Sequence, residues 1–229
     1  MPYISYAEKA MVAIIIDDIG YRKTDANILN LPAKITFSIL PHTPYGKYLA
    51  QQGFANSHEI MLHIPMEAKN GKRLGPGGLT ADMSELTIRK TLTEAFKEIP
   101  FAIGVNNHMG SLLTTLEMPM SWVMKFIKEQ NVIFVDSATS SSSKAGSIAK
   151  TLGIPTLKRD IFLDNNLEHN YIAKQFLLLI NQAKTHGTAI AIAHPHPESI
   201  KSLKELLPQL AKQNIKLVTV SELLTKPTL

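Results

Sequence analysis

Two adjacent carboxylates, Asp17 and Asp18, follow an unbroken apolar run over residues 11–16. Six apolar residues without alternation predict a strand that is buried on both faces. Carboxylates at the end of such a strand are costly unless they are paired. Because neighbouring strand residues point to opposite sides, one aspartate could bind a metal ion while the other accepts a proton. A turn that leads into a helix N-cap is the alternative interpretation of this pair.

Further side chains that can bind metals or move protons recur where other predicted strands end. His63 and Glu67 lie at the third predicted strand, and Asn107 and His108 follow the fourth. The later strand ends carry Asp136, Asp164, His194 and His196. In parallel α/β folds, functional sites form at the carboxyl ends of the strands. The sequence therefore predicts that these side chains gather at one site.

The residue types at these strand ends indicate metal-assisted hydrolysis. Imidazole nitrogens together with one carboxylate suit zinc or a similar divalent ion. Three protein ligands leave one position open for water, whose pKa the ion lowers, and the ion also polarises a carbonyl. A nearby carboxylate can accept a proton, and an opposing histidine can donate one to the leaving group.

Strand patterns and helix patterns alternate along the whole chain. The predicted strands cover residues 12–17, 35–40, 59–64, 102–106, 132–136, 155–162, 188–193 and 217–219. The predicted helices cover residues 24–29, 44–52, 83–98, 119–130, 142–152, 167–185 and 198–212. This alternation predicts an α/β fold with a parallel sheet and right-handed crossovers. A single-domain (β/α) barrel of seven or eight mostly parallel strands is expected. An open doubly wound sheet is the alternative, but the sequence has no G-x-G-x-x-G motif.

Two helix ends and one irregular segment can be predicted from local chemistry. Asp82 is expected to cap the helix that starts at Met83, with Glu85 at its third position. His186 and Gly187 are expected to end the long helix before them, because glycine tolerates the left-handed conformation. Residues 69–78 are rich in glycine and cannot form regular structure, so they predict either a surface loop or a mobile rim over a ligand.

Length and composition limit the possible classes of protein. The 229 residues are expected to form one domain, with its core at about residues 12–224. The chain has no cysteine, which excludes disulfides, thiolate zinc sites and cysteine nucleophiles. The net charge of +5 is spread without a dense Lys/Arg block, so nucleic-acid binding is not predicted. No apolar stretch reaches the roughly 18 residues of a membrane span, and the first ten residues lack a signal-peptide pattern.

The segment around the two aspartates resembles the first motif of the polysaccharide deacetylases, and most closely that of their divergent branch. In that family a Thr-Phe-Asp-Asp-Gly segment ends the first strand, and the match here is residues 15–20. The resemblance covers nearly the whole chain, about residues 12–224. It implies that Asp17 is the catalytic base and that Asp18 binds the metal.

The family's second motif, His-x-x-x-His-Pro, is often preceded by Gly-His-Glu-Ile-Gly-Asn. Aligning Glu59-Ile60 on that Glu-Ile implies His63 as a metal ligand and puts Glu67 at the second ligand position. His58 matches the histidine that is not a ligand, and its spacing to His63 is one residue too long for the motif. The third ligand implied is His108, with Glu67 as the alternative ligand or as a contact to substrate.

The remaining motifs of the family lie on later strands. His108 occupies the region of an Arg-Pro-Pro-Tyr-Gly motif, and the arginine that orients the base in the family has no counterpart here. The last motif, apolar residues followed by histidine, is matched at residues 190–194 and implies His194 as the general acid. His196 and Asn107 are expected to support the site or face substrate. Asp136 and Asp164 are expected either at the wall of the site or as helix caps.

The resemblance implies a metal-dependent hydrolase that removes N- or O-acetyl groups from a carbohydrate. One divalent metal ion is expected, with zinc as the expected identity, and the expected ligand is a carbohydrate. The family suggests the periplasm or the extracellular space, and an export signal could have been removed from the chain. The alternative is a catalytically inactive glycan-binding or regulatory cell-envelope protein on the same fold. Hydrolysis of another bond, such as a phosphoester, is less favoured because the chain gathers few carboxylates.

Overall fold

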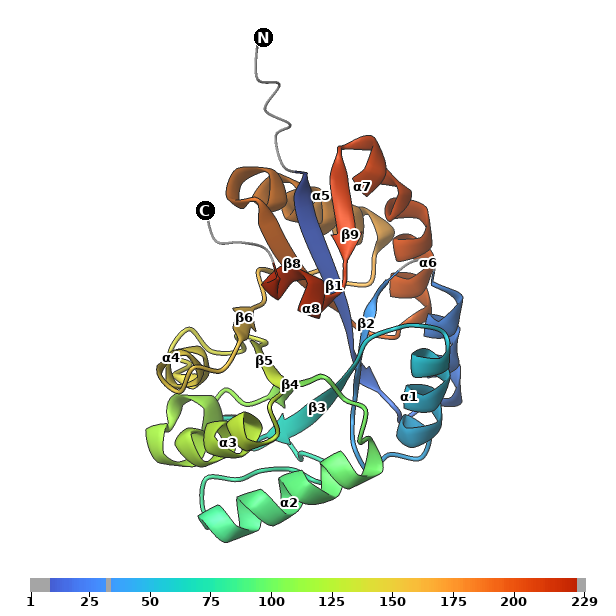
Figure 1. Cartoon of the computed structure of the whole chain (residues 1–229). Helices are drawn as coiled ribbons and strands as arrows, with labels where there is room; N and C mark the ends of the chain where they lie inside the picture. Colours follow the sequence, from blue (N-terminus) through green and yellow to red (C-terminus); the bar gives the residue numbers. More distant parts are fainter. Residues whose placement is uncertain (1–8, 32–33, 226–229) are drawn as a thin grey trace.

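The computed structural model describes residues 9–31 and 34–225 of the chain. These residues form one sheet of nine strands in which every strand pair is parallel (Figure 1). The strands are β1 (Ala10–Ile19), β2 (Thr36–Ile39), β3 (Ile60–Met66), β4 (Gly104–Met109), β5 (Ile133–Asp136), β6 (Thr156–Lys158), β7 (Ile161–Phe162), β8 (Thr188–Ala193) and β9 (Ile215–Val218). Their order across the sheet is β6-β5-β4-β3-β2-β1-β8-β7, and β9 pairs with the first half of β1.

One bent segment belongs to both edges of this sheet. The sequence predicts a single strand at residues 155–162, but its first half, β6, pairs with β5 and its second half, β7, pairs with β8. The change of partner falls between two residues: the Arg159 amide donates to the Asp136 carbonyl at 3.0 Å, and the Asp160 amide donates to the Ile190 carbonyl at 2.9 Å. The segment thereby curls the sheet into a barrel, and the predicted (β/α) barrel architecture is confirmed.

The predicted helices lie between the strands in the predicted order, whereas η2 and α8 were not predicted. The helices of the structure are η1 (Lys23–Asn30), α1 (Gly46–Ala55), α2 (Glu85–Glu98), η2 (Leu113–Thr115), α3 (Glu117–Glu129), α4 (Ala145–Thr151), α5 (His169–His186), α6 (Pro197–Leu206), α7 (Pro208–Lys212) and α8 (Val220–Leu224). The helix predicted at residues 198–212 is divided into α6 and α7. Pro208 begins α7, because a proline lacks the amide proton that a helix interior needs.

Of the two predicted helix ends, the one at Gly187 is confirmed and the one at Asp82 is not. α5 ends at His186, and Gly187 follows in the left-handed conformation with φ of 81°, as predicted. The prediction that Asp82 caps α2 is wrong. Ser84 is the N-cap, and its side chain accepts a hydrogen bond from the Thr87 amide at 3.2 Å. The serine hydroxyl is short enough to reach the third amide of the helix from this position.

Alternate residues of β1 face two apolar layers. Val12 and Ile14 belong to the layer between the sheet and the helices, whereas Ala13 and Ile15 belong to the barrel interior. Each such buried side chain of the size of isoleucine contributes on the order of 1.5–3 kcal/mol to folding. Asp17 continues the interior set, so the alternation of the strand directs this carboxylate into the barrel.

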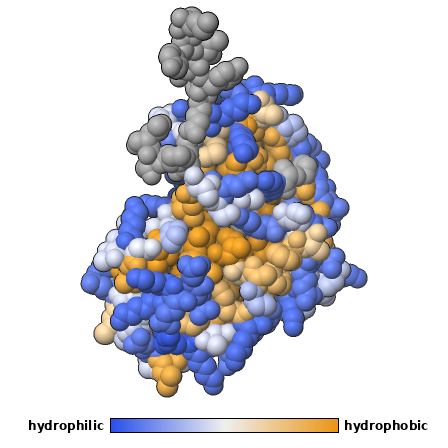
Figure 2. All heavy atoms as spheres, viewed as in Figure 1, coloured by the Kyte–Doolittle hydropathy of each residue, from blue (hydrophilic) through white to orange (hydrophobic). Residues whose placement is uncertain are grey.

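On the face that Figure 2 shows, hydrophilic residues surround an apolar area in the middle, where Figure 1 places α8 and the strands around it. Over the residues that the structure describes, no helix has the length and apolar character needed to cross a membrane.

Candidate metal and active site

The end of β1 departs from regular strand geometry at Asp18. This residue has φ of 58°, and the pairing between β1 and β2 shifts register between Ile16 and Ile19. The expected separation of the two aspartates onto opposite sides is therefore wrong. Both approach the same imidazole nitrogen, His63 Nε2: Asp17 Oδ2 lies 3.7 Å from it and Asp18 Oδ1 lies 3.1 Å from it.

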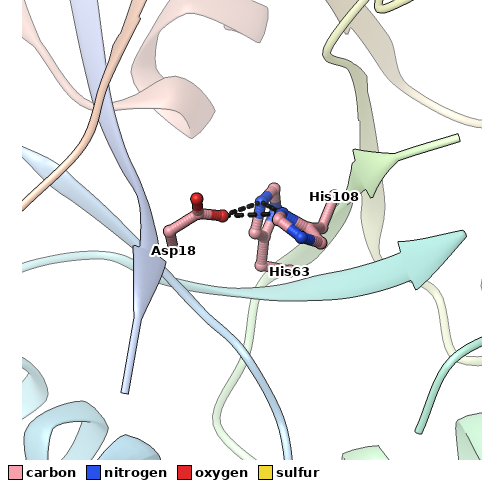
Figure 3. A group of neighbouring side chains, drawn as sticks. All are labelled: Asp18, His63 and His108. Carbon is pink, nitrogen blue, oxygen red and sulfur yellow. Dashed lines mark hydrogen bonds and ion pairs between the residues drawn. The ribbon is translucent and has the colours of Figure 1, made fainter. Parts of the chain in front are cut away.

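Asp18, His63 and His108 form a compact group of three donor atoms (Figure 3). Asp18 Oδ1 lies 2.7 Å from His108 Nδ1, and His108 Nδ1 lies 3.2 Å from His63 Nε2. Zinc with bonds of about 2.0–2.1 Å in a tetrahedral site separates its ligand atoms by about 3.3 Å. The donor set and its spacing therefore fit a zinc-like ion. β1, β3 and β4 each supply one residue of this group.

Asn106 joins this group to Asp17, and it was not predicted as a site residue. Its side chain is fully buried. Its Oδ1 accepts from His63 Nδ1 at 2.7 Å and from the Ser38 hydroxyl at 2.5 Å, and its Nδ2 donates to Asp17 Oδ1 at 2.8 Å. With one proton of His63 held on Nδ1, loss of the Nε2 proton that bonds Asp18 would leave Nε2 with a lone pair for a metal ion.

The two aspartates have opposite pKa shifts. Burial raises the pKa of Asp17 and outweighs the lowering effect of the nearby His63 and His194. Burial also acts to raise the pKa of Asp18, but hydrogen bonds from His108 and His63 outweigh it and hold this pKa well below its usual range. Asp17 is thus the better proton acceptor, and Asp18 stays anionic.

His194 follows β8 and is held by Asp164. His194 Nδ1 donates to Asp164 Oδ1 at 2.9 Å, and the Ser199 hydroxyl and the His194 amide donate to Asp164 Oδ2 at 2.6 and 2.7 Å. Burial alone would lower the pKa of His194, but the bond to Asp164 and the charges of Asp164, Asp18 and Asp17 raise it to about 9. His194 Nε2 points toward Asp18, with 3.9 Å to its Oδ2.

Two of the predicted supporting residues lie beside the site and hold loops. Asn107 Oδ1 accepts from the Ser137 amide at 2.9 Å, and its Nδ2 donates to the Met109 carbonyl at 2.8 Å. Asp136 accepts from the Ser143 hydroxyl at 2.8 Å. Neither side chain belongs to the group around Asp18 or lines the cavity at that group, and Asp136 lines a separate hollow beside α4.

Glu67 and His196 occupy different hollows. Glu67 Oε2 accepts from the Ala81 amide at 2.7 Å and lines a hollow under the loop of residues 67–80. The structure thus brings His108, and not Glu67, to the metal-binding group. His196 lines the cavity that Asp18, His108 and His194 also line. His58 is a core residue, and its Nδ1 donates to the Ile35 carbonyl at 2.9 Å.

Comparison with known proteins identifies the family. The family model of the divergent polysaccharide deacetylases matches residues 14–224. The chain belongs to this family. The uncharacterized protein YibQ of Escherichia coli (strain K12) is 35% identical over 217 residues, which are 94% of this chain and 68% of that protein.

Solved structures support the same fold for this divergent polysaccharide deacetylase. An uncharacterized protein, ATU2773 from Agrobacterium tumefaciens C58, has a TM-score of 0.89 at 26% identity and covers 97% of this chain and 92% of its own. BA3943 from Bacillus anthracis, a CE4 family pseudoenzyme, has a TM-score of 0.58 at 17% identity and covers 94% of this chain and 66% of its own. A mutant of that pseudoenzyme with restored enzymatic activity has a TM-score of 0.59.

Proposed function

We propose that this protein is a metal-dependent hydrolase of the cell envelope that removes N- or O-acetyl groups from a carbohydrate. The observation that carries the proposal is the group of Asp18, His63 and His108, with the charged groups of Asp17 and His194 within 4 Å of it. A zinc or similar ion held by these three residues would supply an activated water and polarise the acetyl carbonyl.

Asp17 is the proposed general base. Its Oδ1 is occupied by Asn106 Nδ2, which leaves Oδ2 toward His63 and free to accept the proton of the attacking water. Its raised pKa brings the carboxylate closer to the range in which a base works well near neutral pH.

His194 is the proposed general acid. Its hydrogen bond to Asp164 and the charges of Asp164, Asp18 and Asp17 raise its pKa to about 9, so that Nε2 carries a proton at neutral pH. That proton goes to the amine or alcohol as its bond to the acetyl carbon breaks, and acetate is the second product. Asp17 and His194 thus divide the two proton transfers between them.

Metal content and acetate release test the proposal together. Purified wild type is expected to hold one zinc or similar ion per chain, and Asp18→Ala is expected to lose it. Asp17→Asn is expected to keep the metal and to lose about 10²-fold or more of acetate release from acetylated oligosaccharides. A wild type that takes up no zinc, or an Asp17→Asn variant with full activity, contradicts the proposal.

A glycan-binding protein without turnover is the second candidate. It is favoured by one observation: the neutral Asn106, rather than the motif arginine of the family, contacts the proposed base. The fold alone does not decide between the two functions. Oligosaccharide binding by zinc-loaded wild type without any acetate release would select this second candidate.

A further inference from the structure

The cavity beside the metal-binding group carries an aromatic residue and an arginine at its rim. Asp18 and His194 line this cavity together with Tyr21 and Arg22. Tyr21 is 48% exposed, and Arg22 is also exposed. An exposed tyrosine ring offers an apolar face with a polar end, which suits a sugar ring.

The turn that carries Tyr21 and Arg22 is fixed from below. The amides of Gly20 and Arg22 both donate to Oδ2 of the buried Asp25, each at 3.0 Å. The backbone at the rim is therefore held in place, and the Arg22 side chain extends from a rigid base. A rigid base reduces the entropy lost when a guanidinium pairs with a ligand.

A second hollow adjoins this cavity at Tyr21. It lies under the loop of residues 67–80 and is lined by Lys72, Arg73 and Gly75, among others. A side chain at Gly75 would collide with the Tyr21 hydroxyl, so this loop and the rim of the cavity are in contact. A ligand longer than one sugar unit that passes Tyr21 would therefore meet this loop.

The side of the site formed by the turn at Arg22 and the loop of residues 67–80 is positively charged. Arg22, Lys72 and Arg73 are all exposed. Within residues 9–31 and 34–225, the ion pairs of lysine and arginine side chains belong to other residues, namely Lys34, Arg89 and Lys144. Two acidic side chains of these segments accept hydrogen bonds from the backbone, Asp25 from the turn and Glu67 from the Ala81 amide.

The segments that follow β7 and β8 differ in charge from the segments that carry Arg22, Lys72 and Arg73. The segments that follow β7 and β8 carry Glu168 and Glu198, both exposed, and the buried Asp164. Charges of one sign gathered on one side of a cavity raise the local concentration of ligands of the opposite sign. A guanidinium is also the side chain best suited to bind a carboxylate through two parallel hydrogen bonds.

We propose that the carbohydrate recognised at this site is acidic: a sugar ring lies against Tyr21, and its carboxylate is bound by Arg22. Lys72 and Arg73 attract the neighbouring units of the same acidic chain. This inference deepens the proposed function, since it uses the same cavity, but it concerns the charge of the ligand and does not require turnover.

Equilibrium binding tests the proposal without turnover. The ligand is an oligosaccharide of N-acetylglucosamine in which alternate rings carry a lactyl ether carboxylate, and its matched control is the methyl ester of the same oligosaccharide. Zinc-loaded wild type and zinc-loaded Asp17→Asn are expected to bind the acid at least about tenfold more tightly than the ester, because charge-assisted pairs are the stronger ones.

Three variants separate the roles of the cations. Arg22→Gln is expected to lower affinity for the acid about tenfold and to leave affinity for the ester unchanged. The double variant with Lys72→Gln and Arg73→Gln is expected to reduce the salt dependence of binding to the acid. Lys212→Gln removes one positive charge from the exposed end of α7, at the amino end of the strands. It is expected to change neither the affinity for the acid nor the salt dependence of binding.

Two results would overturn the proposal that the ligand is acidic. One is equal affinity of wild type for the acid and the ester, and the other is an Arg22→Gln variant that keeps the full preference for the acid. Acetate release is measured in parallel on both ligands. Tighter binding of the acid than of the ester without any acetate release contradicts the proposed hydrolase and supports the acidic ligand. Equal acetate release from the acid and the ester contradicts only the proposal of an acidic ligand.

Discussion

The Asn106 amide is the point at which the proposed base and a proposed metal ligand are held together. Its carbonyl oxygen fixes the proton of His63 on Nδ1, and its amino group occupies one oxygen of Asp17. Because the carboxylate of Asp17 can only accept, the amide has one orientation that satisfies Asp17, His63 and Ser38 together. One neutral side chain therefore sets the geometry of two charged ones.

Replacing Asn106 with leucine, which has a similar volume, is expected to weaken both functions of this amide. Zinc affinity is expected to fall about 10–100-fold, as for other residues that orient a metal ligand. The free energy of unfolding is expected to fall by about 1–3 kcal/mol, because buried polar groups lose their partner. Zinc titration and urea unfolding measure these two effects.

Ser38→Ala is the graded comparison, since it removes only one of the bonds of Asn106. It is expected to have a much smaller effect on zinc affinity. Equal zinc affinity in wild type and Asn106→Leu would show that this amide does not orient His63.

Asp164→Asn is expected to lower the pKa of His194 from about 9, because the hydrogen bond and the negative charge of Asp164 raise it. The proposed acid works only while protonated, so the alkaline limit of acetate release is expected to move to lower pH in the variant. An NMR titration of His194 in the metal-free protein measures the pKa directly. An unchanged pKa would show that Asp164 does not set the protonation state of His194.

At the scale of elements, the segment from β6 to β7 is fastened at its bend by Arg159. Its Nε donates to the Ser137 carbonyl at 2.7 Å and one terminal nitrogen donates to the Ala138 carbonyl at 3.0 Å. The guanidinium also lies over the Phe162 ring, 3.7 Å from its centroid. Arg159 thus ties the loop after β5 to the strand that pairs with β8.

Arg159→Lys keeps the charge but loses the planar fork that bonds both carbonyls. The free energy of unfolding is expected to fall by about 1–3 kcal/mol. Arg89→Lys, at an exposed ion pair with Glu129, is the matched control and is expected to have a much smaller effect. Urea denaturation measures both. Equal stability of the two variants would show that the hydrogen bonds of Arg159 do not stabilise the closed barrel.

The positions of the strands could be predicted from the sequence, but the directions of some side chains and one change of strand partner could not. The apolar run before Asp17 predicts a buried strand, and β1 is confirmed with both faces buried. The period of two in β4 could have shown that Asn106 faces the same side as His108, in place of the predicted Asn107. The left-handed Asp18 and the change of strand partner after Arg159 arise from tertiary contacts, which local patterns do not encode.

At the scale of the whole molecule, the barrel brings together residues that are far apart in the sequence. The metal-binding group unites β1, β3 and β4, and His194 approaches it from β8. An unfolded chain cannot hold such a group, so metal binding and folding are linked.

Zinc is therefore expected to stabilise the folded protein. At a zinc concentration about 1,000 times the dissociation constant, the gain is about 4 kcal/mol, seen as a higher Tm. His108→Ala is expected to lose most of this gain. His196→Ala, which removes a histidine outside the group, is expected to keep it. A Tm of wild type that does not respond to zinc or to a chelator would contradict a metal site formed by the fold.

The bend between β6 and β7 also decides where the chain tolerates a change of length. Only Arg159 and Asp160 lie between two strands at opposite edges of the sheet, and two residues span at most about 7 Å. An added residue there would shift every later side chain of β7 by one place and reverse the direction in which it points. The glycine-rich loop at residues 69–78 has no strand register to lose. Natural variation in length should therefore be found in that loop and be absent from the bend.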